Sequence, residues 1–80
     1  MNTAELAKTY VAAAGALRTN TDAVMELIEG GRVESPEFDQ LWQQREHAFA
    51  AWNNAALLVR DLPTDHMAIV IREIEHFQAG

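Results

Sequence analysis

Apolar residues recur through the first part of the chain at alternating intervals of four and three, which places their side chains along one face of an α-helix. Six of the seven positions are apolar, and the series is Leu6, Tyr10, Ala13, Leu17, Asn20, Val24 and Leu27. Asn2 followed by Glu5 is typical of a capped helix start, and Gly30 is suited to the left-handed residue that commonly ends a helix. The pattern therefore predicts a long helix from about 3 to 29.

Two positions of this first helix interrupt the apolar pattern. Asn20 lies within the series, and either it is partly exposed near the helix edge or it is buried, where a polar side chain fixes the register of two helices. Gly15 lies in a run of alanines and costs roughly 1 kcal/mol of helix stability relative to alanine. Close approach of another helix would offset this cost, and simple tolerance is the alternative. The sequence leaves both questions open.

A second series with the same spacing predicts a helix from about 36 to 60. Its start carries Ser35 as N-cap, Pro36 at the first helical position, and acidic residues near the positive end of the helix dipole. The series is Phe38, Trp42, Arg45, Phe49, Trp52, Ala56 and Val59, with Leu41, Ala48, Ala55 and Leu62 beside it. This apolar face is wider than one antiparallel neighbour can cover, so a further element or a partner should pack against it.

The third segment, from about 64 to 78, predicts a shorter helix with Thr64 after Pro63 as its N-cap. The residues on one helical stripe are Met67, Val70, Ile71, Ile74 and Phe77. The β-branched run at 69–71 is also typical of a strand, but no other segment predicts a strand with which it could pair. We therefore predict a helix that covers part of the broad face of the second segment.

These segments predict an all-α fold, a long antiparallel helical hairpin followed by a shorter C-terminal helix, within a single domain at 1–80. A chain of 80 residues is close to the smallest size at which one core offsets the conformational entropy of folding. Pairing of two hairpins into a larger helical bundle would bury the aromatic side chains of the second segment. The sequence therefore predicts a homodimer with a symmetric interface.

Charge and composition argue against several classes of function. Twelve acidic against six basic residues give a formal net charge of −6, which opposes direct binding to nucleic acid or to anionic lipid. Cysteine is absent, which favours a reducing, cytoplasmic setting. No apolar run approaches the ~20 residues of a membrane span, and the first residues lack the pattern of a secretory signal. We expect a soluble cytoplasmic protein that does not bind membranes.

Candidate residues for catalysis are few. Ser35 is the only serine and already serves as a helix cap, and Lys8 is the only lysine. Lys8 lies near an exposed N-terminus, and nucleophilic catalysis needs an activated side chain with a base in reach. Neither residue is a good candidate, so we predict no enzymatic activity and no cofactor. Glu73 and His76 have the i, i+3 spacing of ligands in di-iron bundles, but such sites need a second pair and this chain contains one. A metal-binding bundle using this pair is an alternative hypothesis.

Two surfaces remain as candidate contact sites. Half of the acidic residues surround the first connection: Asp22, Glu26, Glu29, Glu34, Glu37 and Asp39. Glu26 and Glu29 oppose the dipole at the end of their helix, and such an uncompensated arrangement can mark a binding site for a basic partner. The second surface is the apolar face formed by Phe38, Trp42, Phe49 and Trp52.

The main functional hypothesis is a non-enzymatic protein that inhibits or regulates another protein. One form of it is a phage or mobile-element inhibitor whose carboxylates block a basic nucleic-acid-binding surface. A structural assembly subunit is a further alternative, and the sequence identifies no family.

Overall fold

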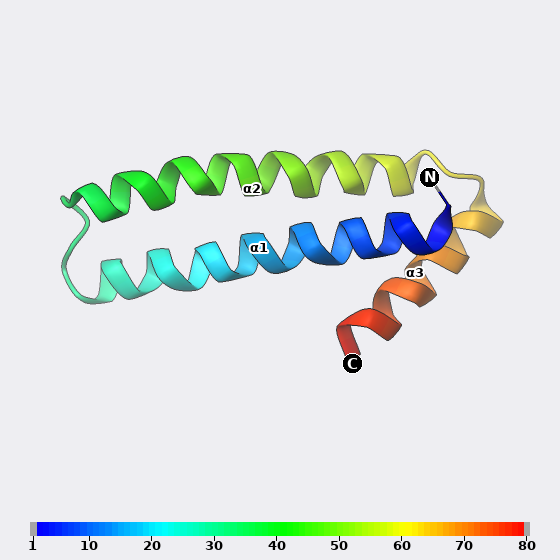
Figure 1. Cartoon of the computed structure of the whole chain (residues 1–80), viewed down its shortest axis with the longest axis horizontal. Helices are drawn as coiled ribbons and strands as arrows, with labels where there is room; N and C mark the ends of the chain where they lie inside the picture. Colours follow the sequence, from blue (N-terminus) through cyan, green and yellow to red (C-terminus); the bar gives the residue numbers. More distant parts are fainter. Residues whose placement is uncertain (1, 80) are drawn as a thin grey trace.

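Three helices account for nearly all of the computed structural model, which describes residues 2–79 (Figure 1). Helix α1 spans Thr3–Glu29, α2 spans Pro36–Arg60 and α3 spans Thr64–Ala79. These bounds lie within one residue of the predicted ranges. The β-branched run at 69–71 lies within α3, so the prediction of a helix there is confirmed.

Side chains cap the first two helices as their sequences predict. The Asn2 side-chain oxygen accepts a hydrogen bond of 2.8 Å from the backbone N–H of Glu5. The Ser35 hydroxyl accepts one of 3.2 Å from the N–H of Phe38 and donates one of 2.7 Å to the carbonyl oxygen of Arg32. These bonds satisfy N–H groups that have no partner within the helix and so fix where α1 and α2 begin.

The end of α1 differs by one residue from the prediction. Gly30 has a φ of −83°, and the left-handed residue is Gly31, with a φ of +70°. The N–H of Gly31 donates to the carbonyl oxygen of Ile28 over 3.1 Å, and the N–H of Arg32 donates to that of Leu27 over 2.8 Å. This pair of bonds is a Schellman motif, in which the left-handed residue follows the cap rather than occupying it.

The start of α3 also corrects a prediction. The N–H of Met67 donates a hydrogen bond of 2.9 Å to the carbonyl oxygen of Pro63. Thr64 is therefore the first helical residue and not the N-cap, because the cap is the residue whose carbonyl accepts the first helical bond.

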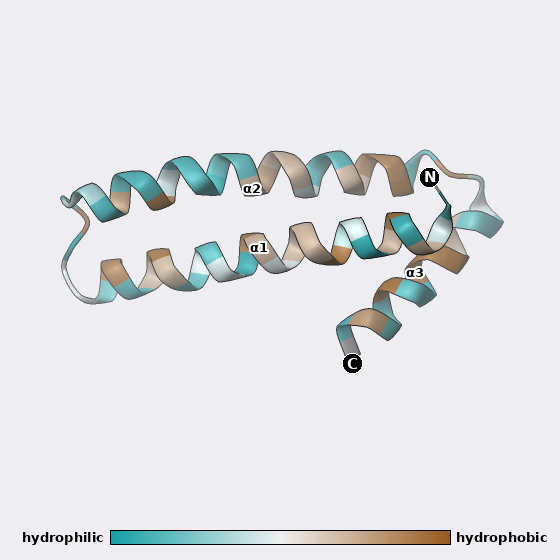
Figure 2. Cartoon of the chain, viewed as in Figure 1, coloured by the Kyte–Doolittle hydropathy of each residue, from teal (hydrophilic) through white to brown (hydrophobic). Residues whose placement is uncertain are grey.

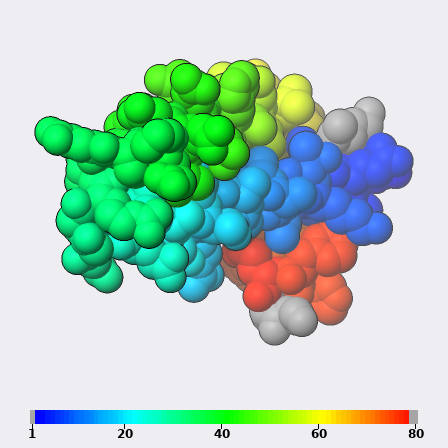
Figure 3. Space-filling view, turned by 60° about the vertical axis from the view of Figure 1, so that its left-hand side comes forward, coloured from blue at the N-terminus to red at the C-terminus, as the bar shows by residue number. Residues whose placement is uncertain are grey.

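Helix α1 lies between the other two helices. It runs antiparallel to α2 along the whole hairpin, and α3 rests on its N-terminal half, as Figures 1 and 3 both show. Helix α3 contacts α1 far more than α2, so the prediction that it covers the face of α2 is wrong. The reason is the small side chain of Ala7, fully buried, which lets Val70 and Ile74 of α3 approach α1 closely.

The core is small and lies mainly where the three helices meet. Its main cluster consists of Leu6, Ala7, Val59, Val70 and Ile74. Figure 2 shows apolar residues in the last turns of α2 and along much of α3, where these helices approach α1. Within residues 2–79, Val70 is the largest side chain that is fully buried, and no aromatic side chain is. The largest side chains are therefore exposed or only partly buried.

Candidate protein-binding surfaces

Helix α2 packs on α1 through a seam that is rotated from the predicted one. Its buried and half-buried positions are Phe38, Leu41, Arg45, Ala48, Trp52, Ala55, Ala56 and Val59. Ala48 takes the place of the predicted Phe49 in this seam, and Ala55 is buried more deeply than the predicted Ala56, because small side chains let two helix backbones approach. Trp42 is 48% exposed and Phe49 is 53% exposed, so neither of them fills the interior of the hairpin.

The aromatic side chains of α2 form two pairs along one side of the helix. The rings of Phe38 and Trp42 stack with centroids 5.7 Å apart, and those of Phe49 and Trp52 lie 5.9 Å apart at a tilt. Tyr10 of α1 extends the second pair, with its ring centroid 6.3 Å from that of Trp52. We call these five residues the aromatic face. The predicted apolar face of α2 thus exists as a surface, and what covers it stays a prediction.

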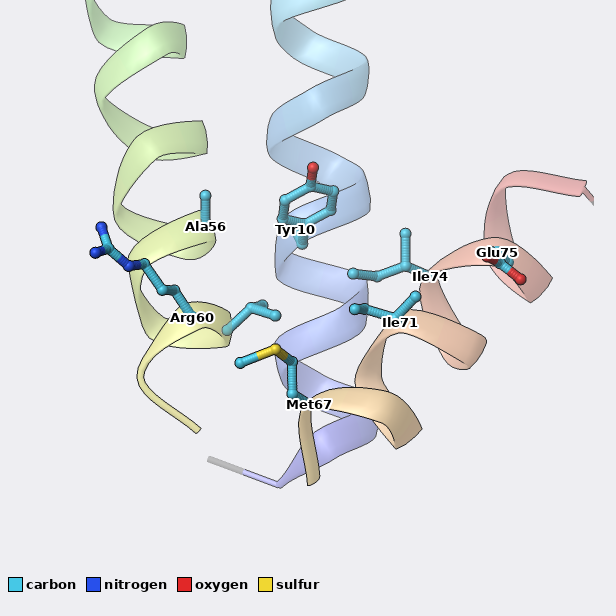
Figure 4. Close-up of a pocket in the computed structure, with 8 residues that line it drawn as sticks. Tyr10, Ala56, Arg60, Met67, Ile71, Ile74 and Glu75 are labelled. Carbon is cyan, nitrogen blue, oxygen red and sulfur yellow. The ribbon is translucent and has the colours of Figure 1, made fainter. Parts of the chain in front are cut away.

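A pocket of about 370 Å³ adjoins the aromatic face between α2 and α3. Figure 4 shows Tyr10 of α1 between Ala56 of α2 and Ile74 of α3. The lining residues are Tyr10, Ala56, Val59, Arg60, Met67, Ile71, Ile74 and Glu75. Most of them are apolar, so the pocket extends the aromatic face toward α3. Sequence reasoning missed it because it placed α3 over α2.

Three polar side chains meet within the hairpin. Asn20 is buried, and its side-chain amide donates a hydrogen bond of 2.8 Å to the carbonyl oxygen of Leu41. The guanidinium of Arg45 donates to the Thr21 hydroxyl over 2.6 Å and to the Asn20 side-chain oxygen over 3.4 Å. The Arg45 guanidinium also lies 6.0 Å from the centre of the Trp42 ring. The open question about Asn20 is therefore resolved in favour of burial.

The six acidic residues around the first connection all lie at one end of the hairpin. Each of Asp22, Glu26, Glu29, Glu34, Glu37 and Asp39 is exposed. Three exposed apolar side chains, Met25, Ile28 and Val33, lie among them, each 45% exposed. We call these nine residues the acidic end. Sequence reasoning identified the acids but not the apolar residues, although positions 25 and 28 each follow a seam position directly.

The Glu73 and His76 pair has one unusual property. The Glu73 Oε2 atom is shielded from solvent and has no hydrogen-bond partner. The His76 ring packs edge-on against Phe77, with centroids 5.9 Å apart. Across residues 2–79, no group of three or more His, Cys, Asp or Glu side chains is arranged to hold a metal ion.

None of the helices in the described part of the chain combines the length and the apolar character needed to cross a membrane. A scan against models of protein families finds no match, and searches of curated proteins and of solved structures find none either.

Proposed function

We propose that the protein is a non-enzymatic protein-binding protein that inhibits or regulates a partner through its acidic end. The observation that carries the proposal is the presence of three exposed apolar side chains among six exposed carboxylates at one end of the hairpin. Protein interfaces commonly combine apolar contacts with a polar rim, and complementary charge directs the encounter. A partner with a basic surface and a small apolar patch fits this arrangement.

The charges in the last turn of α1 favour a basic partner in particular. Glu26 and Glu29 lie at the negative end of the helix dipole, and that turn contains no basic residue. The repulsion between these two carboxylates and the negative end of the helix dipole decreases when a cation approaches. Binding to a basic surface therefore relieves an unfavourable arrangement that the isolated chain carries.

A basic surface that normally binds nucleic acid is one such partner. Carboxylates at the end of a rigid hairpin can occupy positions that phosphate groups would otherwise take. The protein would then act as an inhibitor of the kind that phages and mobile elements encode. We expect this action in the cytoplasm, which suits a chain without cysteine.

The proposal is tested by comparing two variants that remove the same number of charges from opposite ends. Glu26→Gln/Glu29→Gln changes the acidic end, and Asp61→Asn/Asp65→Asn changes exposed residues at the other end of the hairpin. Tagged forms of both variants and of the wild type are used to isolate a partner from the native host. The affinity for the purified partner is then measured across a range of salt concentrations.

We expect the wild type and the Asp61/Asp65 variant to bind alike, with affinity that falls as salt rises. The Glu26/Glu29 variant should bind more weakly and with a smaller salt dependence. Equal affinity and equal salt dependence in all three proteins would show that the acidic end does not bind the partner.

A metal-binding function is a second candidate because of the unpartnered Oε2 atom of Glu73. A cation held with His76 of the same helix would satisfy this oxygen. Elemental analysis of untagged protein tests the idea, with Glu73→Gln as the matched variant. Absence of stoichiometric metal from the wild type would exclude it.

A further inference from the structure

The chain exposes more surface to solvent than a compact protein of the same mass. Its accessible surface is 5787 Å², whereas a compact monomer of 8.9 kDa exposes about 4,800 Å². Its radius of gyration is 15.2 Å, against about 12 Å for a compact chain of 80 residues. The difference in area is about 1,000 Å², which is similar to the ~800 Å² that each partner buries in a standard interface.

This excess surface follows from the arrangement of the helices in one layer. Because α1 separates α2 from α3, the Cα positions extend 47 × 23 × 15 Å. Helical domains usually bury their apolar side chains between two layers, and one layer leaves both of its faces open. A second layer could therefore pack against at least one face of this layer.

The two faces of the layer differ in the side chains they carry. The aromatic face and the adjoining pocket hold large apolar groups such as Trp42, Phe49 and Ile71, each more than 40% exposed. A pocket on the opposite side of the hairpin is lined by Ala16, Thr19, Asn20, Ala23, Leu41, Gln44 and Ala48. Its residues are mostly small or polar. The aromatic face therefore exposes the larger apolar side chains, and it is the face that a partner would bury.

We propose that a second copy of this chain covers the aromatic face, forming a symmetric dimer in which the two hairpins stack face to face and antiparallel. The excess area of the chain is similar to the area that each partner buries in a standard dimer interface. A twofold axis brings the same face of both copies together, so the aromatic face of one chain would pack against the aromatic face of the other.

Charge determines the antiparallel direction. Each chain has a formal net charge of −6, and half of its acidic residues lie at the acidic end. A parallel dimer would place the two acidic ends side by side, whereas an antiparallel dimer separates them to opposite ends.

This arrangement leaves the acidic ends free at both ends of the dimer. It does not depend on the proposed function, because the two proposals use different residues. Two results would distinguish the two proposals. The Glu26/Glu29 variant could lose partner binding and remain a dimer, or a monomeric protein could still bind the partner.

The first test measures mass in solution by sedimentation equilibrium across about two decades of protein concentration. We expect a dimer of twice 8.9 kDa. Phe49→Glu should weaken the dimer by at least about tenfold and leave the helical circular dichroism spectrum unchanged. The matched control is Leu58→Glu, since Leu58 is 52% exposed and lies nine residues further along α2, on the opposite side of the helix.

Three results would overturn the proposal. The wild type could remain at 8.9 kDa at the highest concentration, or it could form species larger than a dimer, which would favour an assembly subunit. Leu58→Glu could also weaken the dimer as much as Phe49→Glu does.

The second test measures the direction of the dimer. Val33→Cys places a single spin label at the acidic end, because the chain has no other cysteine. We expect a distance between the two labels comparable to the 47 Å length of the chain. A distance near one helix diameter, about 10–12 Å, would show a parallel dimer and overturn the antiparallel arrangement.

Discussion

The side-chain amide of Asn20 on α1 donates a hydrogen bond of 2.8 Å to the backbone carbonyl oxygen of Leu41 on α2. This contact joins the two long helices at one defined pair of positions. An apolar seam tolerates a shift along the helix axis better than a hydrogen bond does, because dispersion contacts are not directional. Asn20 therefore sets the register of the hairpin, and that register determines which side of α2 remains exposed.

Replacing Asn20 by alanine should destabilise the chain. The variant loses the bond to Leu41 and leaves the Arg45 guanidinium with one fewer acceptor, at a cost of about 1–2 kcal/mol in the free energy of unfolding. Urea unfolding followed by circular dichroism measures this change. Thr19→Ala is the control, since Thr19 is exposed and should alter stability by less than about 0.5 kcal/mol. Equal effects of the two substitutions would contradict a special role for Asn20.

Arg45 and Thr21 should show energetic coupling across the hairpin. The guanidinium donates to the Thr21 hydroxyl over 2.6 Å, and the hydroxyl in turn donates to the carbonyl oxygen of Leu17 over 2.9 Å. A double-mutant cycle with Arg45→Met and Thr21→Val should give a coupling free energy of about 0.5–1.5 kcal/mol. A value near zero would mean that the two side chains act independently in solution.

Gly15→Ala should stabilise the chain by roughly 1 kcal/mol. A Cβ atom placed on Gly15 meets no other atom within 4 Å, and alanine is the better helix former in the interior of α1. This geometry decides between the two interpretations of Gly15 in favour of simple tolerance. Thermal unfolding gives the measurement, and Ala12→Gly at an exposed position of the same helix should produce the opposite shift. A destabilised Gly15→Ala variant would mean that another helix approaches this position after all.

The helices and the N-caps of α1 and α2 could be predicted from the sequence because their signals are local. Ser35 and the spacing of the apolar residues depend only on neighbours a few positions away, and both predictions are confirmed. The orientation of α2 about its axis could not be predicted in the same way. The broad apolar face admits two seams, and the choice of Ala48 over Phe49 depends on how closely α1 can approach.

The position of α3 was missed for a related reason. An apolar stripe shows that a helix packs against something, but it does not say against which neighbour. Ala7 is fully buried in the cluster with Val70 and Ile74, and it is inconspicuous in an alanine-rich helix. Of the aromatic residues of α2, Trp42 and Phe49 are exposed, and whether they form a contact surface stays a prediction. Their exposure follows from packing that a local pattern does not encode.

The most deeply buried side chains of this protein are not its largest ones, and this difference gives a further prediction. Val70 is fully buried within the cluster formed with Leu6 and Ile74, so Val70→Ala should cost about 2 kcal/mol through lost burial and the cavity that remains. Trp42 is far larger but 48% exposed. In the isolated chain, Trp42→Ala should therefore cost about 1 kcal/mol or less.

Protein concentration should distinguish the two substitutions further. Association stabilises the folded state by mass action, so removal of an interface residue lowers stability most where the dimer is populated. The effect of Val70→Ala on the urea midpoint should be similar at low and high protein concentration, whereas the effect of Trp42→Ala should grow as concentration rises. A constant effect of Trp42→Ala would show that its side chain contributes only within one chain, which would argue against an interface at the aromatic face.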